Sequence, residues 1–138
     1  MTASYFLDTN ILVYSVDEKD KAKQRTARDL IASLVQNDDA IISTQTLQEF
    51  YNAATKKLIA SKKDAGLFVK QFSDIIPVHS NTVSDVLAAI DISEASQLSF
   101  WDSLILASAK ACGCTTVYSE DLNDGQTING VKVVNPFK

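Results

Sequence analysis

Histidine, cysteine, proline and glycine are all scarce in this chain. Its 138 residues contain one histidine, two cysteines, two prolines and four glycines. The single histidine, His79, has no partner visible in the sequence, which argues against a histidine-based nucleophilic triad. The cysteines are Cys112 and Cys114, a spacing that is poor for a disulfide, and no further Cys/His cluster completes a zinc site. We instead expect Cys112 on a helix, Gly113 as its left-handed cap and Cys114 at the entry of a strand.

Long apolar runs and glycine-rich phosphate loops are also missing. No stretch is long enough to span a membrane, and Met1–Ser4 has neither the basic nor the apolar region of a signal peptide. We therefore expect a cytoplasmic protein without a membrane partner. Neither GxxxxGK[ST] nor GxGxxG occurs, which disfavours nucleoside triphosphate and dinucleotide chemistry.

The overall composition is that of a folded, mildly acidic protein. Hydrophobic residues make up 46% and charged residues 22%, which predicts one globular domain over residues 1–138. The net charge of −4 argues against broad nucleic-acid binding by the whole surface. Two segments are nevertheless basic, and their cations are Lys19, Lys21, Lys23, Arg25 and Arg28, and Lys56, Lys57, Lys62 and Lys63. Both fit solvated helix faces, with local phosphate contacts as the alternative.

Short apolar runs alternate with segments of helical periodicity. We predict strands at residues 5–7, 40–43, 77–78, 115–119 and 131–134. We predict a short helix or turn at residues 11–16 and helices at about 21–36, 44–60, 62–75, 81–96 and 99–112. This order predicts an α/β domain of three layers, with a mostly parallel central sheet of four to five short strands flanked by helices.

Four acidic residues occupy comparable positions in this predicted fold. Asp8 ends the first strand, and Glu49 lies in the first turns of the helix after the second. Asp102 lies in the first turn of the helix that begins at Ser99, and Asp121 follows the fourth strand. The carboxyl ends of parallel strands share one edge of the sheet, where ligands collect. We therefore expect these four side chains to converge.

Each acid also has an ordinary structural alternative. An Asp at the exit of a strand commonly caps the next helix, and Asp121 suits a polar loop. Thr46–Glu49 and Ser99–Asp102 both fit the capping-box pattern, in which the acid reaches back to the start of its helix. Glu49 also lies away from the apolar stripe of its helix, so solvent exposure explains it as well.

Convergence of the four carboxylates restricts the chemistry of the site. Ionised carboxylates at close range raise one another's pKa unless a cation relieves the repulsion. A set of oxygen ligands without His or Cys indicates Mg²⁺ or Mn²⁺. One such ion, or a pair about 4 Å apart, can activate water for an in-line phosphoryl displacement. Thr9, Asn10 and Ser119 add hydroxyl and amide groups that can hold metal-bound water or a phosphate.

Three segments resemble the signature blocks of PIN-domain nucleases, in particular the VapC-type toxins of bacterial toxin–antitoxin pairs. These blocks are Leu7–Leu12, Leu98–Ile105 and Ser119–Gly125, and the ends Ile128–Val131 and Asn135–Phe137 are also similar. The resemblance spans essentially the whole chain. It implies a PIN-like fold and a Mg²⁺-dependent endoribonuclease that hydrolyses RNA with a metal-activated water, without a covalent enzyme intermediate.

The resemblance also assigns roles to individual acids. Asp8, Glu49, Asp102 and Asp121 match the family's acidic quartet, and Asp124 matches an additional acid. By analogy, Asp8 and Asp102 are the principal Mg²⁺ ligands, and Glu49 and Asp121 complete the site directly or through water. The alignment of Glu49 rests on the least distinctive surroundings.

Other groups and partners follow from the same resemblance. Thr9, Asn10 and Ser119 are expected to support the ligands. The family is commonly homodimeric and is neutralised by a cognate antitoxin whose tail occupies the active-site groove, so RNA, an antitoxin and a second copy are the expected partners.

Two other functions remain open at this point. One is a haloacid-dehalogenase-like phosphohydrolase with Asp8 as nucleophile, although Asn10 stands where that class has a second Asp. The other is a non-catalytic PIN-like module that binds RNA or protein, whose expected mark is a missing acid.

Overall fold

The computed structural model describes residues 5–138, so the expectation about Met1–Ser4 lies outside the described residues. The strands are β1 (Tyr5–Leu7), β2 (Ala40–Ser43), β3 (Val78–His79), β4 (Thr116–Tyr118), β5 (Thr127–Ile128) and β6 (Val131–Val134). The helices are α1 (Thr9–Val16), α2 (Lys21–Gln36), α3 (Thr44–Lys56), α4 (Lys62–Ile75), α5 (Val83–Ala95) and α6 (Phe100–Ala111).

The strands form one sheet with the order β3-β2-β1-β4-β6-β5. All neighbouring pairs are parallel except β5 and β6, so the predicted mostly parallel sheet is confirmed. Within residues 5–138 the sheet has six strands, and the one that sequence reasoning missed is the two-residue β5. The strands β1 and β4 are central and adjacent, which places their carboxyl ends side by side.

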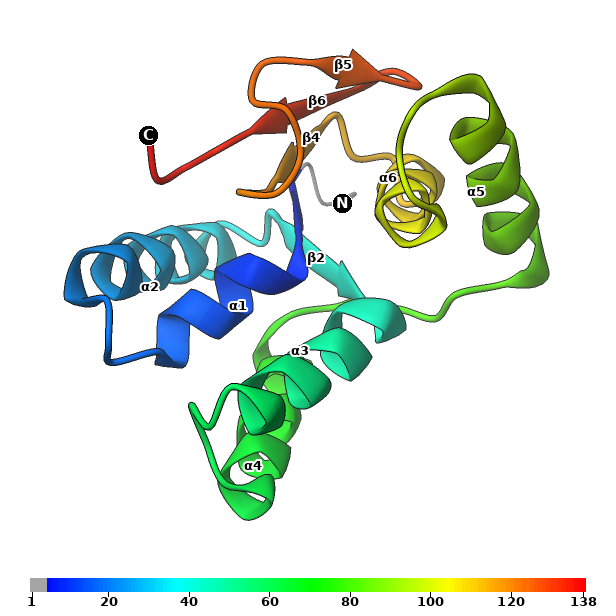
Figure 1. Ribbon diagram of the computed structural model, residues 1–138. Helices are drawn as coiled ribbons and strands as arrows, with labels where there is room; N and C mark the ends of the chain where they lie inside the picture. Colours follow the sequence, from blue (N-terminus) through cyan, green and yellow to red (C-terminus); the bar gives the residue numbers. More distant parts are fainter. Residues whose placement is uncertain (1–4) are drawn as a thin grey trace.

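Helices cover both faces of the sheet and make the predicted three layers (Figure 1). Successive side chains of a strand point to opposite faces, and β1 shows this directly. Leu7 packs in a core with α1, α2, α3 and α4, whereas its neighbour Phe6 packs in a second core with α5 and α6. Among the described residues, no helix is both long and apolar enough to cross a membrane.

Several helix ends differ from the predicted ones for local reasons. The helix α1 begins at Thr9 instead of Ile11, because Asp8 caps it. The helix α3 ends at Lys56, four residues before the predicted end, where Leu58 adopts a positive φ of 56°. In the cysteine segment the left-handed Gly113 is confirmed by its φ of 77°, whereas Cys112 is the C-cap just after α6 and Cys114 lies two residues before β4.

Candidate active site

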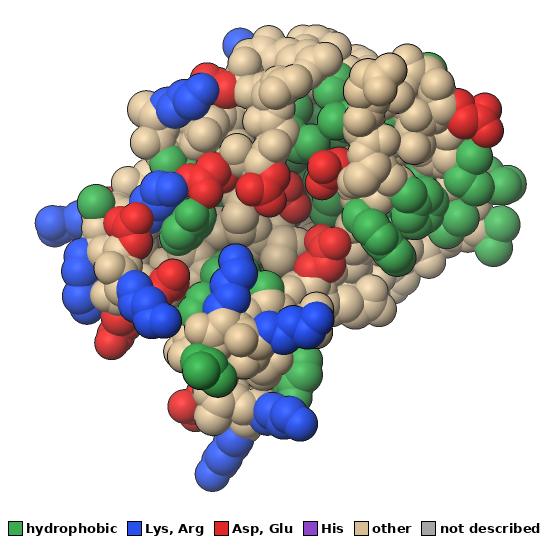
Figure 2. Space-filling view, viewed as in Figure 1, with side chains coloured by type: hydrophobic (Ala, Val, Ile, Leu, Met, Phe, Trp, Pro, Cys, Tyr) green, Lys and Arg blue, Asp and Glu red, His purple; other side chains and the backbone are tan. Residues whose placement is uncertain are grey.

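The four predicted acids line one pocket at the carboxyl edge of β1 and β4. This acidic pocket has a volume of about 460 Å³, and the acidic quartet (Asp8, Glu49, Asp102 and Asp121) lies in its wall. Figure 2 shows a row of acidic side chains across the middle of this face of the molecule. Each acid arrives from a different element: the end of β1, the second turn of α3, the first turn of α6 and the loop after β4.

Asp8 is the buried centre of the pocket. It is 5% exposed, and its Oδ1 accepts a hydrogen bond from the backbone N–H of Thr9 at 2.7 Å. Its Oδ2 accepts from the Ser119 hydroxyl at 2.7 Å. Burial raises the pKa of Asp8 to about 7, and the charges of Asp121 and Glu49 add to the rise, against the opposing hydrogen bonds from Ser119 and Thr9. Asp8 is thus a helix cap and a member of the acid cluster at once.

Asn10 and Ser119 join the turn after β1 to the loop after β4. The Asn10 side-chain amide donates to Asp121 Oδ2 at 3.1 Å, and its Oδ1 accepts from the backbone N–H of Glu120 at 3.1 Å. The Ser119 hydroxyl donates to Asp8 and accepts from the backbone N–H of Asp121 at 3.2 Å. The two side chains therefore hold Asp8 and Asp121 in a fixed relation across 113 residues of sequence. The structure brings both together with the acids, as the sequence predicted.

Glu49 faces the pocket because a different residue caps its helix. The capping box of α3 is formed by Ser43 and Thr46, so the predicted Thr46–Glu49 box is wrong. Ser43, the last residue of β2, lies three residues before Thr46 and takes the cap position. Released from capping, Glu49 Oε1 accepts a hydrogen bond from the Thr9 hydroxyl at 2.8 Å.

Asp102 fulfils half of its predicted capping box. Its backbone N–H donates to the Ser99 hydroxyl at 3.1 Å. Within the described chain the Ser99 backbone N–H does not complete the box; the carboxylate lines the pocket and keeps a side-chain interaction with the Ser99 hydroxyl. Partial burial raises the pKa of Asp102, and the negative charge of Asp121 raises it further, with the Ser99 hydrogen bond opposing both.

Asp124 lies apart from the other predicted site residues. It is not among the residues that line the acidic pocket. Its Oδ1 accepts a hydrogen bond from the backbone N–H of Asn135 at 2.8 Å, which fastens the segment after β6 to the loop after β4. The structure thus gives Asp124 a structural contact and does not bring it to the quartet.

A paired cluster at the rim of the pocket was not predicted. Glu120 lines the pocket, forms an ion pair with Lys23 and accepts a hydrogen bond from the Tyr14 hydroxyl at 2.6 Å. Partial burial opposes ionisation of Glu120, but Lys23 and Tyr14 outweigh it and lower its pKa. Glu120 is therefore neutralised within the protein, unlike the quartet. Its position beside Asp121 was a usable signal, whereas Lys23 is 97 residues away in sequence.

The acidic quartet offers the donor atoms that a divalent cation prefers, but its side chains are not arranged around a common point. Among residues 5–138, no three His, Cys, Asp or Glu side chains are arranged ready to hold a metal ion. The carboxylates accept instead from Thr9, Asn10 and Ser119. The donors are nevertheless all oxygens, and a buried carboxylate with a raised pKa is the kind of group that Mg²⁺ or Mn²⁺ stabilises.

Comparison with solved structures shows that the fold is shared with toxin–antitoxin proteins. VapBC2 from Rickettsia felis, solved bound to a DNA fragment from their promoter, matches with a TM-score of 0.71 and 17% identity, over 94% of this chain and 96% of that chain. VapC20 from Mycobacterium tuberculosis, described as a Sarcin-Ricin loop cleaving toxin, has a TM-score of 0.67 and 20% identity, over 86% and 90%. A toxin-antitoxin complex from Klebsiella pneumoniae has a TM-score of 0.68 and 19% identity, over 96% and 98%.

Sequence comparison places the chain in a family. No curated protein sequence matches it significantly. The family model described as "PIN domain" matches residues 5–123. That match runs through β1, α3, α6 and the loop after β4, which carry the acidic quartet, and the chain is therefore a member of the PIN domain family.

Proposed function

We propose that this protein is a Mg²⁺-dependent endoribonuclease and the toxin of a toxin–antitoxin pair. The observation that carries the proposal is the convergence of Asp8, Glu49, Asp102 and Asp121 on one pocket. The fold shared with VapC20, described as a Sarcin-Ricin loop cleaving toxin, supports RNA as the substrate class. The proposed reaction is hydrolysis of a phosphodiester bond by water.

The chain's own residues would bind and orient the reacting groups. Asp8 and Asp102 would hold Mg²⁺, with Glu49 and Asp121 completing its ligands directly or through water. The bound ion supplies activation of water and stabilisation of charge on the phosphate. Ser119 and the Thr9 N–H fix the rotamer of Asp8, and Asn10 fixes Asp121, so two of the carboxylates are held before substrate arrives.

The proposal extends to partners and location. The fold matches include VapBC assemblies and a toxin-antitoxin complex, which supports a cognate antitoxin as the neutralising partner of this protein. We propose that it acts as a homodimer on cytoplasmic RNA, as expected for a toxin of this type.

Neither alternative function has an observation in its favour. A phosphohydrolase with Asp8 as nucleophile has a second Asp two residues later, but Asn10 stands there and its side-chain oxygen accepts from the Glu120 N–H. A non-catalytic module is expected to lack an acid, but all four acids line the pocket. Trapping of a phospho-aspartate, or calorimetry with Mn²⁺ that shows no binding, would support the first or the second of these instead.

The experiment compares wild type with Asp8→Asn and with Asp29→Asn. Asp29 is an exposed acid on α2, so its variant removes the same charge far from the pocket. With total RNA and Mg²⁺, we expect wild type and Asp29→Asn to cleave and Asp8→Asn to lose at least about 100-fold in rate. EDTA should abolish cleavage by wild type. Undiminished cleavage by Asp8→Asn, or in EDTA, would overturn the proposal.

A further inference from the structure

One lysine lies in the wall of the acidic pocket. Glu49, Ala53 and Lys57 all line it, and their spacing of four residues places them along one side of α3 and its C-cap. Asn52, on the neighbouring turn, lines it as well. Eight residues of helix rise about 12 Å, so Glu49 lines the pocket at the start of α3 and Lys57 lines it at the end.

Lys57 has no counter-ion among residues 5–138. In residues 5–138, the carboxylate that pairs with a lysine within 4.0 Å is Glu120, and its partner is Lys23. Lys57 is exposed, and its ammonium group makes no hydrogen bond or ion pair within the described chain. The pocket is lined by six acids, which are Asp8, Asp17, Glu49, Asp102, Glu120 and Asp121. A lysine that pairs with none of them is available to an anion from outside.

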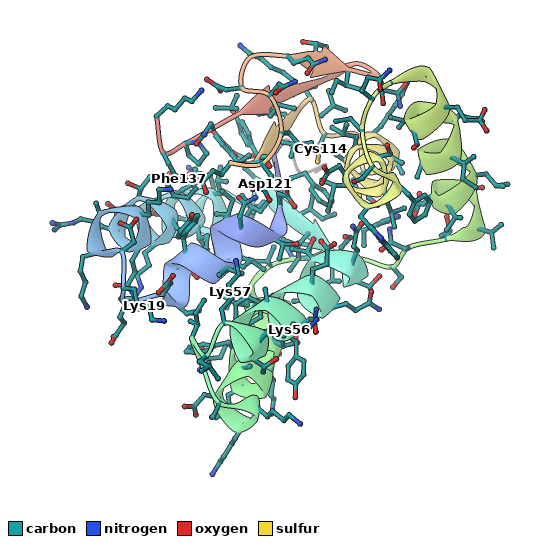
Figure 3. The ribbon with its side chains drawn as sticks, viewed as in Figure 1. Lys19, Lys56, Lys57, Cys114, Asp121 and Phe137 are labelled. Carbon is teal, nitrogen blue, oxygen red and sulfur yellow. The ribbon has the colours of Figure 1, made fainter. Side chains whose placement is uncertain are left out.

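The adjacent Lys56 is a control for the effect of positive charge alone at this end of α3. Both lysines lie at the C-terminal end of α3, where any cation is favoured by the helix dipole. Lys56 is equally exposed but is not among the residues that line the pocket. Figure 3 shows the two side chains leaving the end of α3 in different directions. The helix dipole therefore explains both lysines, but not the position of Lys57 in the pocket wall.

We propose that Lys57 binds a backbone phosphate of the RNA next to the scissile one, with Asn52 contacting the strand between them. This inference rests on the proposed function and adds to it the direction of the RNA strand, which runs along α3 from Glu49 to Lys57. Since Lys57 lies about 12 Å along the helix from Glu49, it contacts a neighbouring phosphate and not the one that reacts. Lys57 is thus a positioning residue.

The test measures the salt dependence of RNA binding in proteins that cannot cleave. Asp8→Asn, alone and combined with Lys57→Gln or Lys56→Gln, is titrated against a fluorescent 20-nucleotide single-stranded RNA of mixed sequence in increasing KCl. Loss of one phosphate contact lowers the slope of log K against log[KCl] by about 0.7 and weakens binding about 5-fold at 0.1 M salt. We expect this change with Lys57→Gln and an unchanged slope with Lys56→Gln.

Kinetics with Asp8 intact complete the test. Lys57→Gln should raise KM about 5-fold and leave kcat within about 2-fold, because the lost contact is equal in the ground and transition states. Equal salt slopes for the two lysine variants, in a protein that cleaves RNA, would overturn the role of Lys57 and leave the proposed function standing. Wild type that neither binds nor cleaves RNA would overturn both.

Discussion

Two aspartates of this protein expose similarly small fractions of their surface and yet have opposite pKa shifts. Asp8 is 5% exposed at the start of α1, and Asp85 is 4% exposed in the first turn of α5. Burial raises the pKa of Asp8 to about 7. Burial opposes ionisation of Asp85 as well, but its hydrogen bonds with Thr82 and His79 outweigh that effect and lower its pKa.

Asp8 lies deeper in the protein than Asp85, so burial raises its pKa more, and the partners of the two carboxylates also differ. Asp85 Oδ2 accepts from the Thr82 N–H at 2.9 Å and lies 2.7 Å from His79 Nε2, and Thr82 returns a capping bond. Asp8 has neutral donors only, and the charges of Asp121 and Glu49 act against its ionisation. The hydrogen bonds of Asp85 thus offset the cost of burying its charge, whereas the described partners of Asp8, a carboxylate of the site, do not offset that cost. Asp85 also supplies His79 with the partner that the sequence did not show.

The largest expected effect is destabilisation by Asp85→Asn. The substitution removes the carboxylate that is hydrogen-bonded with His79 and half of the capping box of α5, at a cost of about 3 kcal/mol in the free energy of unfolding. Urea unfolding at pH 7 measures it. Asp91→Asn, which removes an exposed acid of the same helix, is the control and should change stability by less than about 0.5 kcal/mol. Equal stabilities of the two variants would show that the partners of Asp85 do not stabilise the fold, in contrast to what is inferred from its lowered pKa.

Asp8→Asn is expected to increase the free energy of unfolding, whereas Asp85→Asn decreases it. The native Asp8 binds its proton more tightly than the unfolded chain, so stability falls as pH rises from about 4 to about 7 and then levels. The rise of the Asp8 pKa from 3.8 to about 7 corresponds to about 4 kcal/mol of lost stability at high pH. Asp8→Asn recovers only part of this free energy, because burial of the Asn amide also costs free energy. We expect Asp8→Asn to stabilise the protein by about 2 kcal/mol at pH 8 and much less at pH 5.

Urea unfolding of wild type and Asp8→Asn across pH 5–8 measures this difference. Asp85 serves as the internal contrast, because its pKa is lowered and its contribution is lost only as pH falls below its ordinary value. Asp85→Asn should therefore destabilise the protein at both pH 5 and pH 8, because the bonds of Asp85 with Thr82 are lost at either pH. A loss of stability in Asp8→Asn at pH 8 would show that Asp8 is as well compensated as Asp85.

The smallest expected effect is the response to metal. A ligand that binds only the native state stabilises it by RT ln(1 + [L]/Kd), which is about 1.4 kcal/mol at ten times Kd. Mg²⁺ or Mn²⁺ should therefore raise the Tm of wild type and of Asp85→Asn by a few degrees and leave that of Asp8→Asn unchanged. Differential scanning fluorimetry tests this, and an equal shift in all three proteins would place the metal elsewhere.

Sequence periodicity predicted most of the fold because each helix and strand carries its own pattern. The strand β5 was missed because two residues are too few for a periodic signal. A signal did exist, since Asn129 and Gly130 both have positive φ between β5 and β6, and an Asn-Gly pair is typical of a tight hairpin. The turn residues Asn129 and Gly130 could thus have predicted this hairpin where hydrophobic periodicity could not.

The site was less predictable than the fold, because it depends on contacts across the sheet. The position of Asp8 at the end of β1 followed from the sequence, but the direction of Glu49 depended on whether Thr46 or Ser43 caps α3. The neutralisation of Glu120 by Lys23 joins residues 97 apart in sequence. No rule of sequence spacing predicts such a pair, so the sequence could not show which acids of the pocket are paired with a cation.

The side-chain amide of Asn10 has a further consequence for the evolution of this site. Its oxygen must face the Glu120 N–H, and its nitrogen must face Asp121, so the position needs an acceptor and a donor on one short side chain. An aspartate at position 10 would keep the first contact, but it would turn the second into repulsion between two anions. A PIN domain built this way therefore cannot acquire the Asp-x-Asp pair of a phosphatase in one mutation without losing the hydrogen bond that holds Asp121.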